Sequence, residues 1–469
     1  MMMRNLSTLS LWTVVCASIV AMAFSAGLAA ADDIKVTNFK DGETIRYTTP
    51  LLIGTLADAK ADKITVVNES SKRDTREMTG QAYKGRFKAM TDLVEGENKL
   101  VLAAGGKSIR FRLTYKPQTN PYIFRAVYIT DKTGDTSYDD PKGAKCDVAG
   151  KLGTAMLLMQ SFSAEAMNNK GYGRKTFNVE LDKNGKCKVF VVKGPQEPDA
   201  WAKNGVNDGE LMKAVQEQAG KENASYLIIL GKGCGYTAVG GGGTALFGGK
   251  CIYSWPSSVQ EAQAAFMDTT GIDASKFHID SSAGSVYWGN TTTCIGACLH
   301  EVVHTFGVPH SMDDFCVMTR GFDYFGRFFT LVQAPVTAGG APTEFKSNEE
   351  AYFCDVTAAN VACAKQFALD ARKYAEKGNI TIKYDVQKDV IVAEAELGIR
   401  FLGLEVPYAN PGADFCIKID PNKPAPKKII LQAKEWERFK GNPFQVRVID
   451  SDDHCVTDRQ PLRDKPAKK

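Results

Sequence analysis

The chain has 469 residues, which is too long for one ordinary hydrophobic core, so we expect two to four domains. Its 58 basic and 54 acidic residues nearly balance, with a formal net charge of +4. No dense basic tract occurs before the short lysine-rich C-terminus. The charge pattern therefore gives no electrostatic basis for binding nucleic acid, and we expect no nucleic-acid partner.

The first residues have the pattern of an export signal, predicted at 1–31. Arg4 precedes an apolar segment at 9–24, and small residues follow. Cleavage after Ala31 fits the A-x-A rule and leaves Asp32 first, which predicts a protein that is secreted, periplasmic or at the cell surface. The alternative is a single uncleaved membrane anchor, for which the apolar segment is short. No later stretch is apolar enough to cross a membrane, so we expect no stable span in the mature form.

Export would place the cysteines in an oxidising compartment, where disulfides are more common than zinc–thiolate sites. One of the twelve, Cys16, lies in the export signal, which leaves eleven. Because eleven is odd, at least one thiol should be free or paired with another molecule. We interpret Cys294 and Cys298 as bridged or buried rather than as metal ligands. The eleven are Cys146, Cys187, Cys234, Cys251, Cys294, Cys298, Cys316, Cys354, Cys363, Cys416 and Cys455.

Residues 32–117 have the alternating pattern of a small antiparallel β-sandwich. Short runs at 64–67, 99–102 and 109–113 alternate apolar and polar residues and are separated by turn residues. The segment resembles the immunoglobulin-like modules of exported proteins. We expect it to act as a spacer or brace, with substrate or surface binding as the alternative. A linker with two prolines follows at 117–121.

Residues 118–377 combine strand and helix patterns, including a strand at 124–130 and an amphipathic helix at 151–169. A glycine-rich segment then spans 231–249. It does not fit a phosphate-binding loop, because Cys251 stands where Ser or Thr would bind magnesium. We therefore interpret it as a flexible loop that leads into an edge strand at 250–255. Such a strand could pair with the backbone of an extended peptide.

The most informative stretch is 300–310, HEVVHTFGVPH, which matches H-E-x-x-H-x-x-G-x-x-H, the long zinc-binding signature of metzincin metallopeptidases. On a helix, His300 and His304 lie about one turn apart and can bind the same Zn²⁺. Gly307 can end that helix in a left-handed conformation, so that the returning chain supplies His310 as the third ligand. A fourth position stays open for water or substrate, as in catalytic zinc sites.

Glu301 is the predicted general base of this site. It lies beside the first histidine, where it can accept a proton from a zinc-activated water and pass it to the leaving amine. We expect the helix to begin near 291–293, because threonine hydroxyls suit an N-cap.

Two residues downstream are candidates for supporting roles. Met318 is the candidate for the methionine turn that lies below the zinc ion in metzincins, and Met312 is the competing candidate. Tyr324 could stabilise the oxyanion of the tetrahedral intermediate. Its alternative role is that of a packed aromatic residue among neighbouring phenylalanines.

Beyond the site, a helix at about 358–375 is expected to close the catalytic domain. Residues 378–460 return to a β pattern and predict a second small sandwich-like domain. The acidic cluster at 450–453 fits a solvated turn, with calcium binding as the alternative. The Pro/Lys-rich tail at 461–469 is expected to be disordered.

Residues 122 to about 370 resemble the Metallopep family of zinc metallopeptidases, which is best known from fungal proteins. The matching segments are 165–167, 171–177, 255–256, the histidine motif and 317–320. The resemblance implies a metzincin-type catalytic domain, one zinc ion and peptide hydrolysis with Glu301 as base. The chain differs from fungal relatives in its export signal and its many cysteines, and it has no clear match to their jacalin-like lectin module. The substrate class is therefore not carried over.

These patterns predict a multidomain protein with an α+β metzincin-like catalytic domain, in which a mixed β-sheet carries a zinc-binding helix between two β-sandwich domains. The predicted function is that of an exported zinc-dependent endopeptidase with a protein or peptide substrate. The intact Glu301 argues against a surface-binding or adhesive protein, because a pure binding site needs no base. Zinc-dependent hydrolysis of a non-peptide bond is a further alternative.

Overall fold

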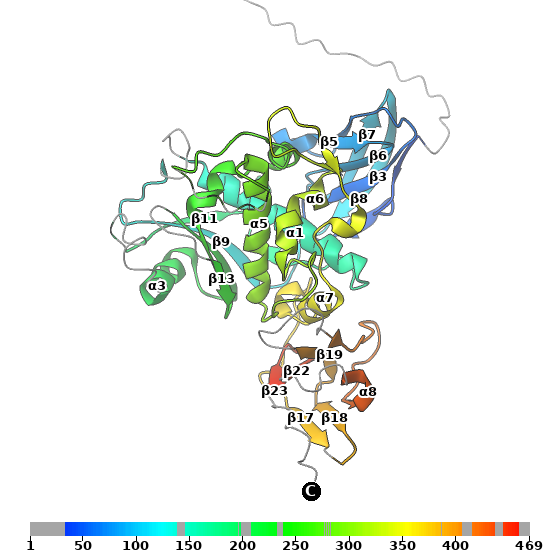
Figure 1. Ribbon diagram of the computed structural model, residues 1–469, viewed down its shortest axis with the longest axis vertical. Coiled ribbons are helices and arrows are strands. Elements are labelled where there is room, and N and C mark those ends of the chain that lie inside the picture. Colours follow the sequence, from blue (N-terminus) through cyan, green and yellow to red (C-terminus); the bar gives the residue numbers. More distant parts are fainter. Residues whose placement is uncertain are drawn as a thin grey trace, which may run out of the picture.

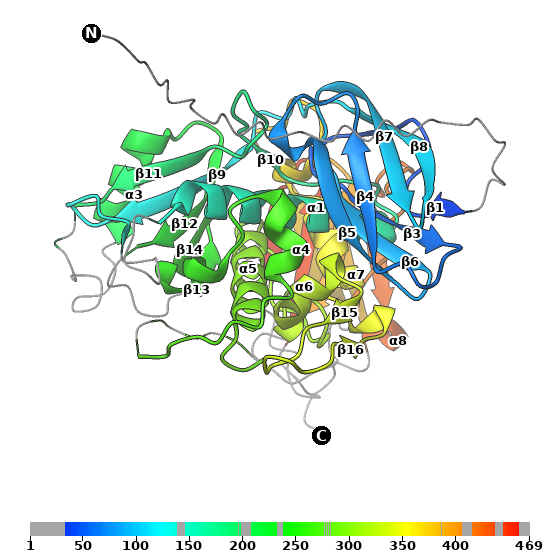
Figure 2. The same cartoon turned by 90° about the horizontal axis from the view of Figure 1, so that it is seen from above.

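The structure is a computed structural model that shows an N-terminal sheet, a central α/β layer and a C-terminal β unit (Figures 1 and 2). The predicted export signal, Cys16, Cys234 and the predicted tail lie outside the described residues. Among the helices that are described, none is long and apolar enough to cross a membrane. The structure describes residues 33–458 except 138–145, 196, 198–207, 232–237, 276, 278, 280, 282, 386, 406–414 and 437–443.

The N-terminal part forms an eight-stranded sheet with the order β1-β3-β6-β5-β4-β7-β8-β2. All its pairs are antiparallel except β2 with β8. Alternate residues such as Ile64 and Val66 enter one core with Tyr47 and Phe87. The predicted strands are thus confirmed, whereas the immunoglobulin-like topology stays a prediction. The strands are β1 (Ile34–Val36), β2 (Glu43–Ile45), β3 (Leu51–Leu56), β4 (Lys63–Asn68), β5 (Glu77–Tyr83), β6 (Arg86–Met90), β7 (Gly96–Ala104) and β8 (Lys107–Tyr115).

The central layer is a mixed sheet with the order β10-β9-β12-β14-β13, and β11 also pairs with β9. All pairs are parallel except the antiparallel pair of β13 and β14. Phe124 and Tyr128 of β9 face one core, while Val127 and Ile129 face another. Burial on both faces explains the continuous apolar run. The strands are β9 (Ile123–Thr130), β10 (Asn178–Val179), β11 (Val189–Lys193), β12 (Ala224–Leu230), β13 (Ala238–Gly241) and β14 (Thr244–Gly248).

Helices cover both faces of the central sheet (Figure 1). Helices α1 (Val148–Asn169) and α5 (Tyr287–His304) pack on one face, and α3 (Asp208–Ala219) packs on the other. Shorter elements complete the layer. They are η3 (Gly249–Ser254), η4 (Val259–Glu261), α4 (Ala262–Ala265), η5 (Arg320–Tyr324), α6 (Phe325–Phe329), β15 (Val332–Gln333), β16 (Thr343–Glu344), η6 (Ser347–Glu349), α7 (Asp355–Val361) and η7 (Lys365–Phe367).

Two predicted elements of this layer are wrong. Residues 250–255 lie mostly in the 3₁₀ helix η3, and the edge strand is β13, which the glycine-rich segment itself forms. The helix expected at 358–375 ends at Val361. Beyond it the chain forms the short 3₁₀ helix η7 and bonds to the linker, where the Asn120 side chain donates to the carbonyl of Lys365 at 2.9 Å and Thr119 N donates to Leu369 O at 3.1 Å.

Six described cysteines carry free thiols in the structure, so the disulfide prediction stays a prediction for them. Most of them are buried. The six are Cys187, Cys251, Cys316, Cys354, Cys363 and Cys455.

The C-terminal part contains a three-stranded sheet, β17-β18-β21, and a four-stranded sheet, β20-β19-β22-β23, that share one core. The acidic cluster forms a turn, because Asp450 Oδ1 accepts hydrogen bonds from the backbone of Asp452 and His454 at 2.8 and 3.0 Å. The elements are β17 (Ile380–Asp385), β18 (Val390–Ala395), β19 (Ile399–Glu405), β20 (Phe415–Cys416), β21 (Lys428–Gln432), α8 (Ala433–Trp436), β22 (Gln445–Asp450) and β23 (Cys455–Asp458).

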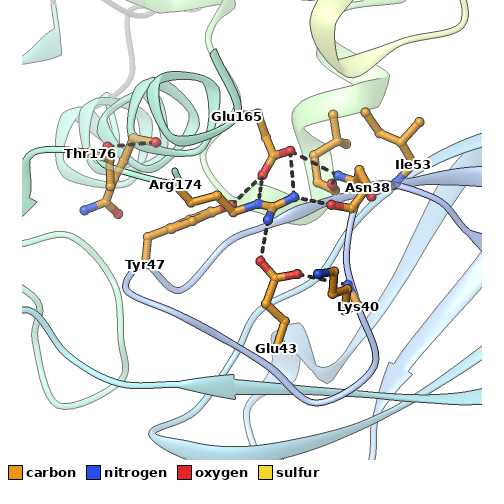
Figure 3. Close-up of polar contacts among 10 residues, drawn as sticks. Asn38, Lys40, Glu43, Tyr47, Ile53, Glu165, Arg174 and Thr176 are labelled. Carbon is orange, nitrogen blue, oxygen red and sulfur yellow. Dashed lines mark hydrogen bonds and ion pairs between the residues drawn. The ribbon is translucent and has the colours of Figure 1, made fainter. Parts of the chain in front are cut away.

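A buried polar network joins the N-terminal sheet to α1 (Figure 3). Glu165 of α1 is 2% exposed, and its Oε1 accepts a hydrogen bond from Tyr47 Oη at 3.0 Å. Arg174 forms ion pairs with both Glu165 and Glu43 and donates to the backbone oxygen of Asn38. Burial, together with the Glu165 carboxylate, raises the pKa of Tyr47 and keeps its hydroxyl protonated. The network balances charges that would otherwise be isolated in the interior.

A second contact joins the N-terminal sheet to the chain beyond the zinc motif. The Lys88 ammonium, 4% exposed, lies 3.0 Å from Glu350 Oε1 and donates to Arg327 O at 2.9 Å. Gln263 donates to Lys88 O at 3.0 Å and to Phe329 O at 2.6 Å. The sheet is therefore a brace that packs directly on the central layer.

We predict that Arg174→Met lowers the free energy of unfolding by about 3 kcal/mol, because it leaves the buried carboxylate of Glu165 without its charge partner. Urea denaturation measures the change. The matched control is Lys84→Met, which removes an exposed ion pair with Glu344 and should change stability little. Equal losses in the two variants would contradict the importance of the buried network.

Candidate metal centre

Helix α5 carries the histidine motif and is buried along most of its length. It begins at Tyr287, not at the predicted 291–293. The threonines there bond to the surrounding core instead of capping the helix, since Thr291 Oγ1 donates to Ser254 O at 2.8 Å and Thr293 Oγ1 donates to Asp323 Oδ1 at 3.1 Å. These bonds fix the helix within the central layer.

Two glycines let neighbouring segments approach α5 closely. A Cβ at Gly296 would overlap the backbone oxygen of Phe322 in η5. A Cβ at Gly240 in β13 would overlap the backbone oxygen of Glu301 and lie 2.8 Å from the Cβ of His304. The helix is therefore held between β13 and η5 at the level of the motif.

The side chains of His300, His304 and His310 converge in the structure, as predicted. Their candidate ligand atoms all lie within 4.8 Å of one another. His300 Nε2 and His304 Nε2 are 3.1 Å apart, close to the spacing of about 3.3 Å that two ligands of a tetrahedral zinc ion would have. The donor set therefore fits zinc. His310 is exposed, so the site opens to solvent on its side.

Backbone carbonyls orient the first two imidazoles. His300 Nδ1 lies 2.7 Å from Val317 O, and His304 Nδ1 lies 2.7 Å from Val308 O. A carbonyl can only accept, so each Nδ1 carries the hydrogen and each Nε2 presents a lone pair. Two lone pairs at 3.1 Å repel one another unless a cation lies between them. This arrangement suits a metal ion.

Burial and the neighbouring imidazoles keep these histidines neutral. Burial, followed by the effect of His304, lowers the pKa of His300 to about 3, and burial also lowers the pKa of His304. The neutral imidazole is the form that binds a metal. Metal and protons therefore do not compete for these ligands near neutral pH.

The motif helix ends at His304, three residues before the predicted Gly307, which lies in the turn that follows. The φ of Gly307 is +76°, and its N–H donates to His304 O at 2.9 Å. The left-handed conformation turns the chain back, so that Val308 O reaches the imidazole of His304 and His310 joins the cluster.

Glu301 is 8% exposed and lies on the same helix as its two histidine neighbours. Burial raises the pKa of Glu301 to about 7, because the charged carboxylate is poorly solvated there. A carboxyl group with such a pKa can accept and release a proton near neutrality.

Met318 is fully buried next to Val317, whose carbonyl orients His300. Its own carbonyl accepts a hydrogen bond from Ser311 N at 2.9 Å, directly after the third histidine. Met312 instead lines a cavity. This placement favours Met318 over Met312 for the methionine turn, which stays a prediction.

Tyr324 packs among side chains near the site. Its ring lies 4.9 Å from that of Phe315, and the Arg327 guanidinium stands 4.2 Å from its centroid. The ring of Phe322 contacts one of the candidate metal-binding histidines, since its centroid lies 5.4 Å from that of the His300 ring. The predicted oxyanion role of Tyr324 stays a prediction, whereas its packed role is evident.

Sequence reasoning missed the carbonyls of Val308 and Val317 that orient the histidines. It also missed the packing of β13 on α5 and the contact of Phe322 with His300. Backbone acceptors leave no signal in residue identity, because any residue supplies a carbonyl. For β13 a signal existed: the glycine run marks a place where the backbone must approach α5 closely.

The fold and the histidine cluster define a mixed α/β protein with a site suited to a metal ion. The chain belongs to the Metallopep family, described as "Putative peptidase family", which it matches over residues 33–202 and 223–400. This span is wider than the predicted 122–370, and it includes the N-terminal sheet. The family supports a peptidase function.

Two curated relatives are named "Putative zinc metalloproteinase". The one from Schizosaccharomyces pombe is 29% identical over 278 residues, and the one from Saccharomyces cerevisiae is 27% identical over 315 residues. The alignments cover 52% and 56% of this chain but 45% of each relative. The chain thus spans about half the length of these relatives. Their names support a zinc metallopeptidase.

Among solved structures, OgpA from Akkermansia muciniphila is similar with a TM-score of 0.45 and 14% identity, covering 73% of this chain and 92% of that one. A catalytically inactive form of OgpA was solved in complex with an O-glycopeptide substrate.

We predict that His304→Ala weakens zinc binding by at least about 100-fold, since losing a ligand costs more than losing a group that orients one. Competition with a chromophoric chelator measures the affinity. His454→Ala is the matched control, because His454 pairs with Asp450 in the C-terminal turn and should leave zinc binding unchanged. Zinc bound as tightly by His304→Ala as by wild type would rule out the histidine cluster as the site.

Gly240→Ala should destabilise the protein by about 1–3 kcal/mol and weaken zinc binding, because the new methyl group pushes β13 away from Glu301 and His304. Thermal unfolding and the same chelator assay measure both effects. Gly271→Ala is the control, since a Cβ at Gly271 would meet nothing within 4 Å. If the two variants behave alike, the close contact of β13 with α5 is not required.

Proposed function

We propose that this protein is an exported zinc-dependent endopeptidase of the metzincin type, which hydrolyses peptide bonds with Glu301 as general base. The observation that carries the proposal is the convergence of three histidine side chains, two with lone pairs fixed by backbone carbonyls, beside a buried carboxyl group. A site that only bound a metal would need no such carboxyl group.

His300, His304 and His310 would hold the ion. Zinc bound there would supply Lewis acidity, which acidifies a water molecule and polarises the scissile carbonyl. Glu301 accepts the proton of the attacking water and delivers it to the nitrogen of the leaving amine. Its burial serves this role, since a carboxylate with an ordinary pKa would accept the proton of the water less readily.

Strand β13 is the proposed binding site for the substrate backbone. It ends the central sheet, and among the described strands it pairs with β14 alone. It packs on α5 at Glu301 and His304, and the side chain of Val239 is 55% exposed. An extended peptide could add to this edge as a further strand, which would lay its backbone across the metal centre.

Export rests on the N-terminal sequence pattern alone. It places the enzyme outside the cytoplasm, where its substrates would be secreted or surface proteins.

The proposal predicts that Glu301→Gln lowers cleavage of an unfolded protein substrate by at least about 100-fold, because the amide cannot accept the proton. Zinc content should stay the same, since none of the three ligands changes. Cleavage is followed by gel and mass spectrometry. Glu217→Gln, at an exposed position of α3, is the matched control and should retain full activity.

Full activity of Glu301→Gln would exclude this residue as the base. Wild-type protein that binds zinc but cleaves no peptide bond in any protein substrate would overturn the endopeptidase function itself.

A further inference from the structure

A cavity of about 450 Å³ opens beside the loop that follows the third histidine. Ser311, Met312, Asp313, Tyr352 and Cys354 are among the residues that line it. Within this wall Tyr352 Oη bonds to the Asp313 carboxylate. The metal centre and the proposed peptide chemistry do not use the Cys354 thiol.

A second thiol lies behind Cys354. The backbone N–H of Cys354 donates to Cys316 Sγ at 3.4 Å, and Thr357 Oγ1 lies 3.3 Å from each of the two sulfur atoms. The segments that carry the cysteines run side by side, since Val317 N donates to Tyr352 O at 2.9 Å. Cys316 is fully buried, whereas Cys354 faces the cavity.

The surroundings of Cys354 favour its thiolate. Ser311 Oγ lies 3.2 Å from its Sγ, and Thr357 N donates to the same sulfur at 3.5 Å. The Cys316 thiol, followed by these hydroxyl and amide groups, lowers the pKa of Cys354. Burial and the neighbouring Cys354 raise the pKa of Cys316. The Cys354 thiol thus borders the cavity in surroundings that favour its thiolate, whereas Cys316 is shielded.

We propose that Cys354 and Cys316 are a nucleophilic and a resolving thiol, which a small disulfide entering the cavity oxidises to an intramolecular bridge. The Cys354 thiolate attacks one sulfur of the small disulfide and releases a first thiol, leaving a mixed disulfide on Cys354. Cys316 then loses its proton, attacks Cys354 Sγ and releases a second thiol. The two cysteines are oxidised by two electrons, and the small disulfide is reduced to two thiols.

The bridge would change the surroundings of the residues that orient and follow the metal-binding histidines. Cys316 precedes Val317, whose carbonyl orients His300, and Cys354 contacts Ser311, which follows His310. Joining the two sulfurs ties the segment that runs from His310 to Val317 to the start of α7. The redox state of the pair is thereby linked to the geometry of two zinc ligands. This inference is independent of the peptidase proposal.

The test uses the full-length zinc-loaded protein, first reduced and freed of reductant, then incubated with glutathione disulfide. We expect the peptides that contain Cys316 and Cys354 to become cross-linked, with the loss of two hydrogen atoms and reversal by a reductant. Peptide mass spectrometry detects the link. Peptides that remain unlinked after prolonged incubation of the folded wild-type protein overturn the proposal.

Two variants assign the roles. Cys316→Ala should stop at the glutathione adduct on Cys354, because the resolving thiol is missing. Cys354→Ser should give neither adduct nor cross-link at Cys316, and serine can still cap α7. Cys455→Ser, which removes an exposed thiol elsewhere, should cross-link like wild type. An adduct on Cys316 in the Cys354→Ser variant would reverse the assigned order and contradict the proposal.

Discussion

The structure depends on keeping two imidazole lone pairs 3.1 Å apart in a buried position. Such an arrangement is unfavourable without a cation, so the protein must fix both rings by other means. It does so with the carbonyls of Val308 and Val317, each 2.7 Å from an Nδ1 atom. The chain must therefore return to α5 twice, once right after the helix and once after the loop that carries His310. The sharp turn at Gly307 and the buried position of Met318 both follow from this requirement.

The same requirement explains why segments distant in sequence are packed so closely on the helix. Gly240 and Gly296 each leave no room for a methyl group between α5 and its neighbour. The approach of β13 brings an open sheet edge to the metal centre, while the approach of η5 places Phe322 against His300. A helix held on both sides cannot rotate, so its histidines keep one direction. Rigidity of this kind is what a preorganised catalytic site requires.

The histidine site could be predicted because its chemistry is encoded in residue types at fixed helical spacing, from His300 to His310. The main strands and α1 were also predictable, since their apolar patterns report burial on one or both faces. The edge strand was assigned to 250–255 because glycine-rich segments are usually loops. The helix beyond Val361 was overestimated, since its hydrogen bonds to the linker depend on tertiary contacts. Contacts of this kind leave no local pattern in the sequence.

The alternating pattern of residues 32–117 predicts the strands of the N-terminal sheet, but it does not predict the contacts of this sheet with the central layer. Read alone, residues 32–117 resemble a detachable module. Yet Glu165 is buried in α1, where Arg174 balances its charge and Tyr47 of the N-terminal part donates a hydrogen bond to its carboxylate. Removing the sheet would expose that network and also leave Glu350 without Lys88. This dependence gives a physical reason for the family match to begin at residue 33: the N-terminal part bonds to the buried Glu165–Arg174 pair and supplies Lys88, which pairs with Glu350.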